Sequence, residues 1–134
     1  MTAIKVYVSL PITGQESTVM NRCLKAKQHI EMLFATADTK GYELEVVFPK
    51  DVDKIGTPEQ DNTKPLSYWI GEDIKLLMEC DAVFFCEGYI RSRGCYLEHK
   101  CATLYHKTIL SQCASIDYNV SLLKSFVSNL DKRE

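Results

Sequence analysis

Two carboxylates, Asp73 and Glu98, occupy positions where helical periodicity favours apolar side chains. At about 100° per residue, each lies in the middle of the apolar face of a predicted helix. The apolar residues that define these two faces are Leu66, Ile70 and Leu77 for Asp73, and Gly94, Cys101, Ala102 and Tyr105 for Glu98. Burying an unpaired carboxylate costs on the order of several kcal/mol, so two such positions need a reason.

A pair of carboxylates, one a nucleophile and one a proton donor, performs retaining glycosyl transfer. Burial would raise the pKa of one acid toward the donor role, while helix N-terminal dipoles would keep the other ionised. An inward acid can instead cap a loop or pair with an arginine, and Arg91 and Arg93 lie close to Glu98 in the sequence. The structural explanation is the stronger one for a single acid, but two acids at one edge favour a function.

The elements that carry these acids alternate along the chain. Predicted strands cover residues 4–9, 44–48, 82–86 and 107–111, and predicted helices cover residues 17–37, 66–79, 92–105 and 117–130. Alternating strands and helices indicate right-handed crossovers and a parallel sheet. The sequence therefore predicts one α/β domain over residues 1–134. We expect a flavodoxin-like, doubly wound fold with a mainly parallel sheet of four or five strands and helices on both faces.

In such folds, ligands bind beyond the carboxyl-terminal ends of the strands. That edge is predicted to consist of residues 10–16, 49–67 and 87–94. The helix that bears Asp73 and the helix that bears Glu98 both begin at this edge, and both acids lie in early turns. The topology therefore predicts that the two carboxylates lie near one ligand site.

Composition narrows the choice of partners. Sixteen basic and eighteen acidic residues give a net charge of −2 without a basic stripe, which argues against nucleic acid as a partner. No apolar run approaches the ~18–20 residues of a membrane span, and the N-terminal segment does not resemble a signal peptide, so we expect a cytoplasmic protein with no membrane contact. Six cysteines without a CxxC pair indicate buried free thiols rather than disulfides or a metal site.

Three segments resemble the nucleoside 2-deoxyribosyltransferase superfamily, including its 2′-deoxynucleoside 5′-phosphate N-hydrolase branch, over roughly residues 4–110. Residues 6–14 (VYVSLPITG) are similar to the family's first strand and its glycine-bearing loop. Asp73 followed by residues 80–83 (CDAV) is similar to the family's acid and the strand after it. Residues 92–102 (SRGCYLEHKCA) resemble the S-x-G-x-x-x-E-x-x-x-A start of a family helix.

The resemblance implies a displacement in two steps. Glu98 would attack the anomeric carbon and hold a glycosyl ester, and Asp73 would protonate the departing base. Water or a second base would then resolve the ester, which gives hydrolase or transferase activity. Tyr7 matches a family tyrosine that orients the nucleophile, although an ordinary strand tyrosine explains it equally well.

The resemblance also implies a substrate-binding set. Its members are Ile12, Thr13, Gly14, Glu87, Arg91, Ser92, Arg93 and Gly94. Ser92 matches a serine that contacts the 5′-phosphate, and it also suits a plain helix N-cap. The nucleotide hydrolases carry an arginine where this chain has Thr13, although Arg91 or Arg93 could replace it. The free-nucleoside transferases carry an acid in place of Ser92, so the choice between nucleoside and 5′-monophosphate stays open.

The expected ligand is thus a nucleoside or nucleotide, without a cofactor or metal, and the resemblance implies a homodimer or higher homo-oligomer. One alternative is a non-catalytic nucleotide-binding module with the same fold. Another is a flavodoxin-like electron-transfer protein, which is disfavoured because the first loop lacks a phosphate cradle rich in serine and threonine.

Overall fold

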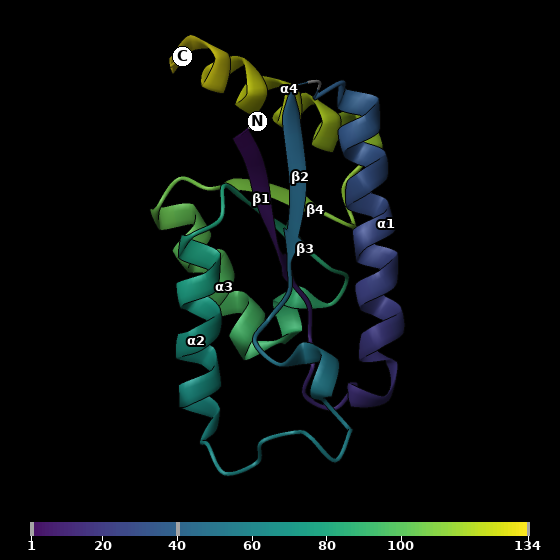
Figure 1. Cartoon of the computed structure of the whole chain (residues 1–134), viewed down its shortest axis with the longest axis vertical. Helices are drawn as coiled ribbons and strands as arrows, with labels where there is room; N and C mark the ends of the chain where they lie inside the picture. Colours follow the sequence, from purple (N-terminus) through teal and green to yellow (C-terminus); the bar gives the residue numbers. More distant parts are fainter. Residues whose placement is uncertain (1, 40, 134) are drawn as a thin grey trace.

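The computed structural model describes residues 2–39 and 41–133, with the side chain of residue 133 left out. Four parallel strands form one sheet in the order β2-β1-β3-β4 (Figure 1). They are β1 (Thr2–Ser9), β2 (Tyr42–Val47), β3 (Ala82–Phe85) and β4 (Thr108–Ser111). The predicted flavodoxin-like α/β fold is confirmed, with four strands in the described part of the chain. The predicted domain limits, residues 1 and 134, lie outside that part.

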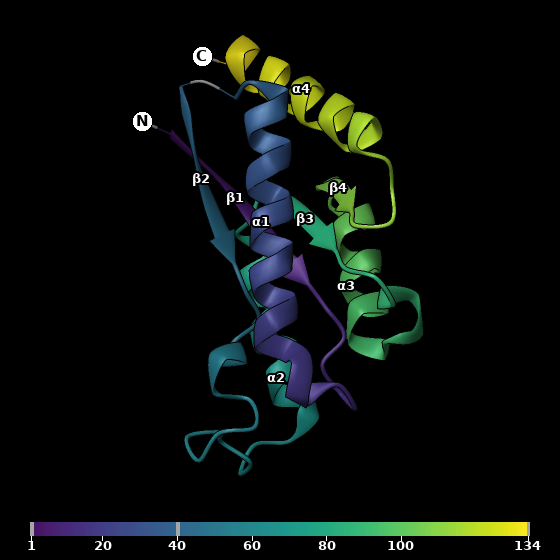
Figure 2. The same cartoon turned by 90° about the vertical axis from the view of Figure 1, so that its right-hand side faces the viewer.

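Helices cover both faces of the sheet. They are α1 (Val19–Ala37), α2 (Leu66–Met78), α3 (Arg93–Leu104) and α4 (Ile116–Arg133). α1 and α4 pack together on one face, and α2 and α3 pack together on the other (Figures 1 and 2). α2 and α3 both run antiparallel to the strands, so their N-termini lie at the carboxyl-terminal edge of the sheet, as predicted.

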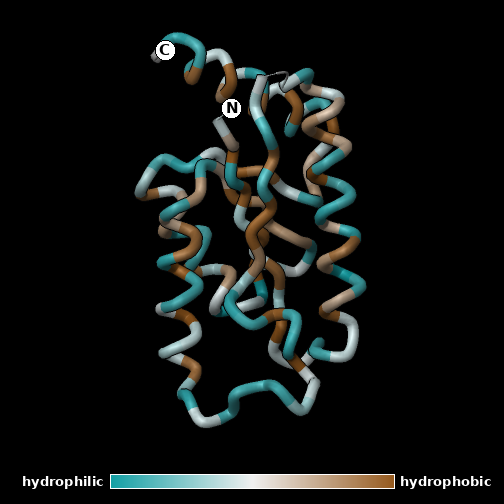
Figure 3. The backbone as a smooth tube through the Cα atoms, in the orientation of Figure 1, coloured by the Kyte–Doolittle hydropathy of each residue, from teal (hydrophilic) through white to brown (hydrophobic). Residues whose placement is uncertain are grey.

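β1 is paired on both sides and is buried on both faces. Its residues alternate in direction: Val6 and Val8 pack in the core under α1 and α4, whereas Tyr7 packs with Leu77 of α2 and Ala102 of α3. Hydrophobic residues concentrate along the strands, while the segment between β2 and α2 is mostly hydrophilic (Figure 3). The apolar sheet thus carries the long polar loop at its carboxyl-terminal edge.

The element bounds differ from prediction by a few residues. β2 begins at Tyr42 rather than 44, because Gly41 turns with a φ of 90° immediately before it. α1 begins at Val19 after a single 3₁₀ turn at Glu16–Thr18. All six cysteines are free, and four of them are buried as predicted, whereas Cys101 is half-buried and Cys113 is exposed. Within residues 2–39 and 41–133, no helix combines the length and apolar character that a membrane span requires.

Candidate functional site

A cleft of about 600 Å³ opens at the carboxyl-terminal edge of the sheet. Its walls come from the β1–α1 loop, the β2–α2 segment, the first turns of α2 and the segment from Gly88 to Glu98. This volume lies within the usual range of small-molecule sites. The cleft occupies the edge that the topology predicted, and both Asp73 and Glu98 line it.

Glu98 lies at the inner end of the cleft, with only 7% of its surface exposed. The Tyr7 hydroxyl donates a hydrogen bond of 2.6 Å to its Oε2, and the Ser9 hydroxyl donates one of 2.7 Å to its Oε1. Burial raises the pKa of Glu98 to about 7, although both hydroxyl donors favour the charged form and oppose the rise. The carboxylate is thus fixed in orientation and titrates near neutral pH.

Asp73 stands on the α2 wall of the cleft and is half-buried, which is less than its predicted position in the middle of an apolar face implied. The backbone N–H of Lys50, after β2, donates a hydrogen bond of 2.7 Å to its Oδ1. Burial raises the pKa of Asp73 to about 6, against that hydrogen bond, and the nearby charges of Glu72 and Asp51 add to the rise. Burial therefore raises the pKa of both acids, where the sequence led us to expect a rise in only one.

Tyr7 lies beneath the cleft rather than in its wall, and it is fully buried. Burial, together with the charges of Glu98 and Asp73, raises its pKa well above the ordinary value of a phenol. The hydroxyl therefore stays protonated near neutral pH and serves as a permanent donor. Tyr7 acts on the cleft only through Glu98.

The N-terminus of α3 forms another wall. Ser92 is its N-cap, because the Ser92 hydroxyl accepts a hydrogen bond of 3.3 Å from the backbone N–H of Cys95. The N-terminal dipole of a helix attracts anions, and the guanidinium-bearing Arg91 and Arg93 also line the cleft here. A Cβ added at Gly94 would meet no atom within 4 Å, so this wall stands open to a ligand.

The cleft brings most of the predicted site residues together. Those that line it are Ile12, Thr13, Asp73, Arg91, Ser92, Arg93, Gly94 and Glu98. Gly14 and Glu87 do not line it. Gly14 has a φ of 81° and turns the first loop, and Glu87 is exposed, with its backbone N–H bound to the Gln112 side chain.

Ser9, which the sequence pattern did not single out, is fully buried and donates a hydrogen bond to Glu98. A signal was available, because side chains two residues apart on a strand share one face of the sheet. Tyr7 was already proposed as a partner of Glu98, and Ser9 follows it by two residues at the end of the same strand.

Arg22 of α1 is a second residue near the cleft that the sequence pattern did not single out. Its Nε donates to the Thr18 hydroxyl at 3.0 Å, and its second terminal nitrogen donates to the Gln15 carbonyl at 3.1 Å. Arg22 thereby braces the loop that follows β1. Burial raises the pKa of Cys95, while hydrogen bonds with Ser9 and Ser92 and the charge of Arg22 lower it.

The outer part of the cleft is apolar. Ile55, Leu66, Trp69 and Ile70 contribute to its lining, together with Pro11 from the first loop. Polar groups of Gln60 and Asp61 lie among them. The cleft thus combines an apolar slot with a pair of carboxylates and an electropositive helix end.

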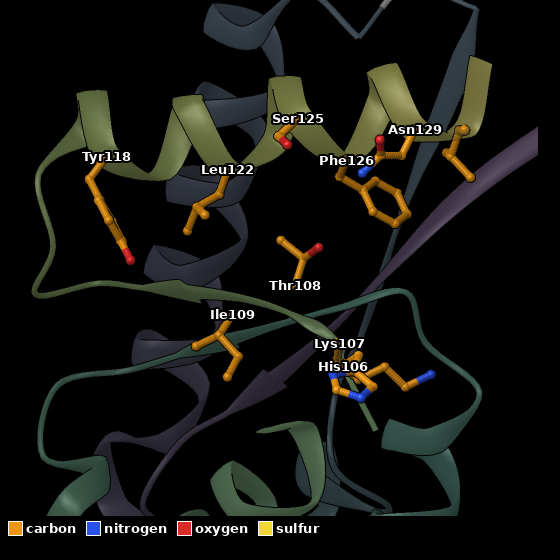
Figure 4. Close-up of a pocket in the computed structure, with 10 residues that line it drawn as sticks. His106, Lys107, Thr108, Ile109, Tyr118, Leu122, Ser125, Phe126 and Asn129 are labelled. Atoms are coloured by element: carbon orange, nitrogen blue, oxygen red, sulfur yellow. The ribbon is translucent and has the colours of Figure 1, made fainter. Parts of the chain in front are cut away.

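A second hollow, of about 380 Å³, lies between β4 and α4 (Figure 4). Residues such as Ile109, Leu122 and Phe126 line it together with polar side chains. Lys107 at its rim donates from Nζ to the Met78 carbonyl at 3.0 Å, so this charge caps the end of α2. None of the predicted site residues lines this hollow.

No protein-family model matches the chain, and no curated protein matches it at a significant level. Among residues 2–39 and 41–133, no group of three or more histidine, cysteine or acidic side chains is arranged to hold a metal ion.

Proposed function

We propose that this protein cleaves or transfers the N-glycosidic bond of 2′-deoxynucleosides or of their 5′-monophosphates. The supporting observation is the pair of Glu98 and Asp73 on one cleft, with both Glu98 oxygens held by the buried hydroxyls of Tyr7 and Ser9. The sequence resemblance to the nucleoside 2-deoxyribosyltransferase superfamily supports the same reaction.

In the first step, a Glu98 oxygen attacks the anomeric carbon. The new C–O bond forms as the C–N bond breaks, and the bonding electron pair of the C–N bond leaves with the base. The two hydroxyl donors keep the carboxylate in one orientation, so little freedom is lost when the ester forms. Burial excludes water from the nucleophile and raises its basicity.

Asp73 supplies the proton that the departing base needs. With a pKa of about 6, a substantial fraction of this carboxyl group is protonated at pH 6 to 7. The Lys50 N–H holds one Asp73 oxygen, which leaves the other to donate to a base nitrogen. Asp73 then accepts a proton from water, or a second base attacks the ester, and Glu98 is released.

The walls of the cleft fit the rest of the substrate. Trp69 and Ile70 offer an apolar surface for the flat base. Ser92 and the arginines at the N-terminus of α3 offer donors to a 5′-phosphate. A monophosphate substrate would therefore depend on Arg91 or Arg93, whereas a free nucleoside would not.

A panel of deoxynucleosides and their 5′-monophosphates, with free base measured by chromatography, tests this proposal. We expect base release by the unmodified protein and at least a thousandfold slower release by Glu98→Gln. Glu87→Gln is the matched control, because Glu87 is an exposed acid that follows β3 at the same edge of the sheet but does not line the cleft. The absence of base release across the panel, or equal rates for both variants, would refute the proposal.

The alternative is a nucleotide-binding module without turnover. One observation favours it: both oxygens of Glu98 already accept hydrogen bonds, as they do in a purely structural carboxylate. This alternative predicts that a nucleotide raises the melting temperature without base release, and that Glu98→Gln leaves the thermal shift intact.

A further inference from the structure

β4 is an edge strand, and one of its sides carries no neighbouring strand. Within residues 2–39 and 41–133 the sheet has the order β2-β1-β3-β4, so β4 pairs with β3 alone (Figure 2). Flavodoxin-like sheets of the order 2-1-3-4-5 carry a fifth strand at this place. An exposed strand edge presents N–H and C=O groups that can pair with another chain. The side of β4 that faces away from β3 is therefore open to a further strand.

The hydrogen bonds of β4 show which of its main-chain groups face the open side. The N–H of Thr108 donates to the Asp81 carbonyl at 3.3 Å. The N–H of Gln112 donates to the Phe85 carbonyl at 2.9 Å, so the main chain at both positions faces β3. Because main-chain groups alternate in direction along a strand, the N–H and C=O of Ile109 face away from β3. Ile109 thus offers a donor and an acceptor to a neighbouring chain.

Asn119 of α4 takes the place of a neighbouring strand at the carboxyl-terminal end of β4. Its side chain is fully buried. The Ser111 N–H donates to its Oδ1 at 3.1 Å, and its Nδ2 donates to the Ser111 carbonyl at 2.8 Å. One amide side chain therefore satisfies both main-chain groups of Ser111, as an adjacent strand would. In the described part of the chain, the Ile109 main chain has no such partner.

The hollow of about 380 Å³ between β4 and α4 adjoins this open edge. Leu122, Ser125 and Phe126 point from α4 toward β4 and follow the length of the strand (Figure 4). The side chain of Thr108 points toward α4, whereas that of Ile109 points away, so Ile109 borders the hollow with its main chain (Figure 4). A hollow that follows a strand and offers a main-chain donor and acceptor suits an extended peptide.

The hollow is bordered by positive charge at one end. Lys107 is the only charged side chain among the ten residues that line it. On α4, Asp117, Lys124 and Asp131 lie roughly 140–180° around the helix from the middle of the lining face, so they face away from the hollow. Lys132 is nearer, at about 80°, and is basic as well.

The acid beside Lys107 is also turned away from the hollow. Asp81 precedes β3, next to the start of β4, and its carboxylate accepts a hydrogen bond of 2.9 Å from the backbone N–H of Lys5 on β1. The Lys107 ammonium donates to the Met78 carbonyl but keeps its charge. This end of the hollow therefore favours an acidic group in a ligand.

We propose that the edge of β4 at Ile109 and the adjoining hollow bind an extended peptide of a partner protein, which pairs with β4 as a fifth strand. The peptide main chain accepts from the Ile109 N–H and donates to the Ile109 C=O. An apolar side chain of the peptide packs on Leu122 and Phe126, and an acidic one lies beside Lys107. The hollow shares no lining residue with the cleft, so this binding does not rest on the proposed reaction.

Fluorescence anisotropy with labelled synthetic peptides tests the proposal. Each peptide alternates apolar and polar residues, and each carries an acidic, a neutral or a basic residue at one end. We expect the acidic peptides to bind at least tenfold more tightly than the basic ones. The absence of binding by every peptide, or equal binding of the acidic and basic ones, would overturn the proposal.

Matched peptides with N-methyl groups along one edge keep their side chains but cannot donate from that edge. Methylation of the edge that faces β4 should weaken binding at least tenfold, and methylation of the other edge should leave binding unchanged. If both methylated peptides bind as tightly as the unmethylated one, the peptide does not bind as a strand and the proposal fails.

Ser125→Arg maps the binding to the hollow. Ser125 is exposed and lines the hollow, so an arginine there projects into it without disturbing the core. We expect at least tenfold weaker peptide binding and an unchanged melting temperature. Ser128→Arg is the matched control, because Ser128 is an exposed serine of the same helix that does not line the hollow. Equal peptide binding by the two variants would contradict the proposed site.

Ile109→Pro tests the main-chain pair itself. Proline removes the outward N–H, and an edge strand tolerates proline where that N–H faces away from the sheet. We expect at least tenfold weaker peptide binding by a variant that circular dichroism shows to be folded, and unchanged binding would overturn the proposal. Light scattering covers the other occupant, a second copy of the chain paired through β4. An oligomer that Ser125→Arg or Ile109→Pro dissociates would assign the edge to that copy and overturn the proposal.

Discussion

The two faces of the sheet are built from the same strands but bury different kinds of side chain. On the α1–α4 face, inward side chains such as Val6, Val8 and Leu33 form the larger buried core, and this core is apolar. On the α2–α3 face, the smaller core contains Tyr7, and Ser9 and Glu98 are buried beside it. The difference shows how one strand, β1, supplies apolar core residues with one set of side chains and hydrogen-bond donors to a buried carboxylate with the alternate set.

Free energy explains this division. Each buried methylene group on the α1–α4 face stabilises the fold by about 0.8 kcal/mol. A buried carboxylate on the other face costs stability, because burial disfavours its charged form. The stability gained by apolar burial on the α1–α4 face therefore offsets the cost of the buried carboxylate on the α2–α3 face. Substitutions on the two faces should have separable effects on folding and activity.

The largest expected effect comes from removing the carboxylate. Glu98→Ala should slow base release by about a thousandfold or more, because no nucleophile remains for the first step. The melting temperature should fall little, since a buried charge is lost together with its hydrogen bonds. Chromatographic assay of base release, with circular dichroism to monitor folding, measures both. A variant with unchanged rates would remove Glu98 from the mechanism.

On the α1–α4 face, Leu33→Ala should have the opposite effect, with a large loss of stability and little loss of activity. Leu33 is fully buried in the α1–α4 core, so its truncation should lower the free energy of unfolding by about 2–5 kcal/mol. Urea titration measures this loss. Activity per folded molecule should stay near that of the unmodified protein, and a large loss of turnover would show that the two faces are coupled.

The raised pKa of Glu98 predicts that stability depends on pH. The ordinary pKa is 4.5 and the folded value is about 7, so the folded protein holds this proton over a range where the unfolded chain has lost it. The Glu98 contribution is therefore fully present below pH 4.5 and is lost as pH rises through 7, at a cost of about 3 kcal/mol. Glu98→Gln should flatten this dependence in urea titrations between pH 4.5 and 7.5.

A smaller change should follow the loss of the Ser9 hydroxyl. Ser9→Ala removes a donor that stabilises ionised Glu98, so the pKa of Glu98 should rise and base release should fall about tenfold near pH 6. The acidic limb of the pH–rate profile should shift upward, whereas a merely structural role would lower the rate equally at all pH values. Ser9→Thr keeps the hydroxyl and should retain the unmodified profile.

Asp73 should control the alkaline limb of the same pH–rate profile. Its carboxyl group acts in the protonated form, so activity should decline as pH rises through its pKa of about 6, while ionisation of Glu98 near pH 7 increases it. The profile should be bell-shaped with its maximum between these values, and the two limbs belong to the pair together. Asp73→Asn should remove the alkaline limb.

The fold and the burial of Glu98 follow from the periodic spacing of apolar residues in the sequence. The alternation of strands and helices predicted the parallel sheet, and the position of Glu98 on an apolar helix face predicted its burial. The same reasoning placed Asp73 too deep, because a helical wheel gives direction but not depth. It also missed the bond from Ser9 to Glu98, which joins residues 89 positions apart in the sequence.

The sequence by itself determined the order of elements, the edge at which the cleft opens and the two carboxylates that line it, because these depend on local periodicity and on the handedness of crossovers. Only the tertiary structure decided that two hydroxyls of β1 hold both Glu98 oxygens and that burial raises the pKa of both acids. Those properties depend on which groups meet across the sheet and on how much water remains between them, and neither is encoded locally.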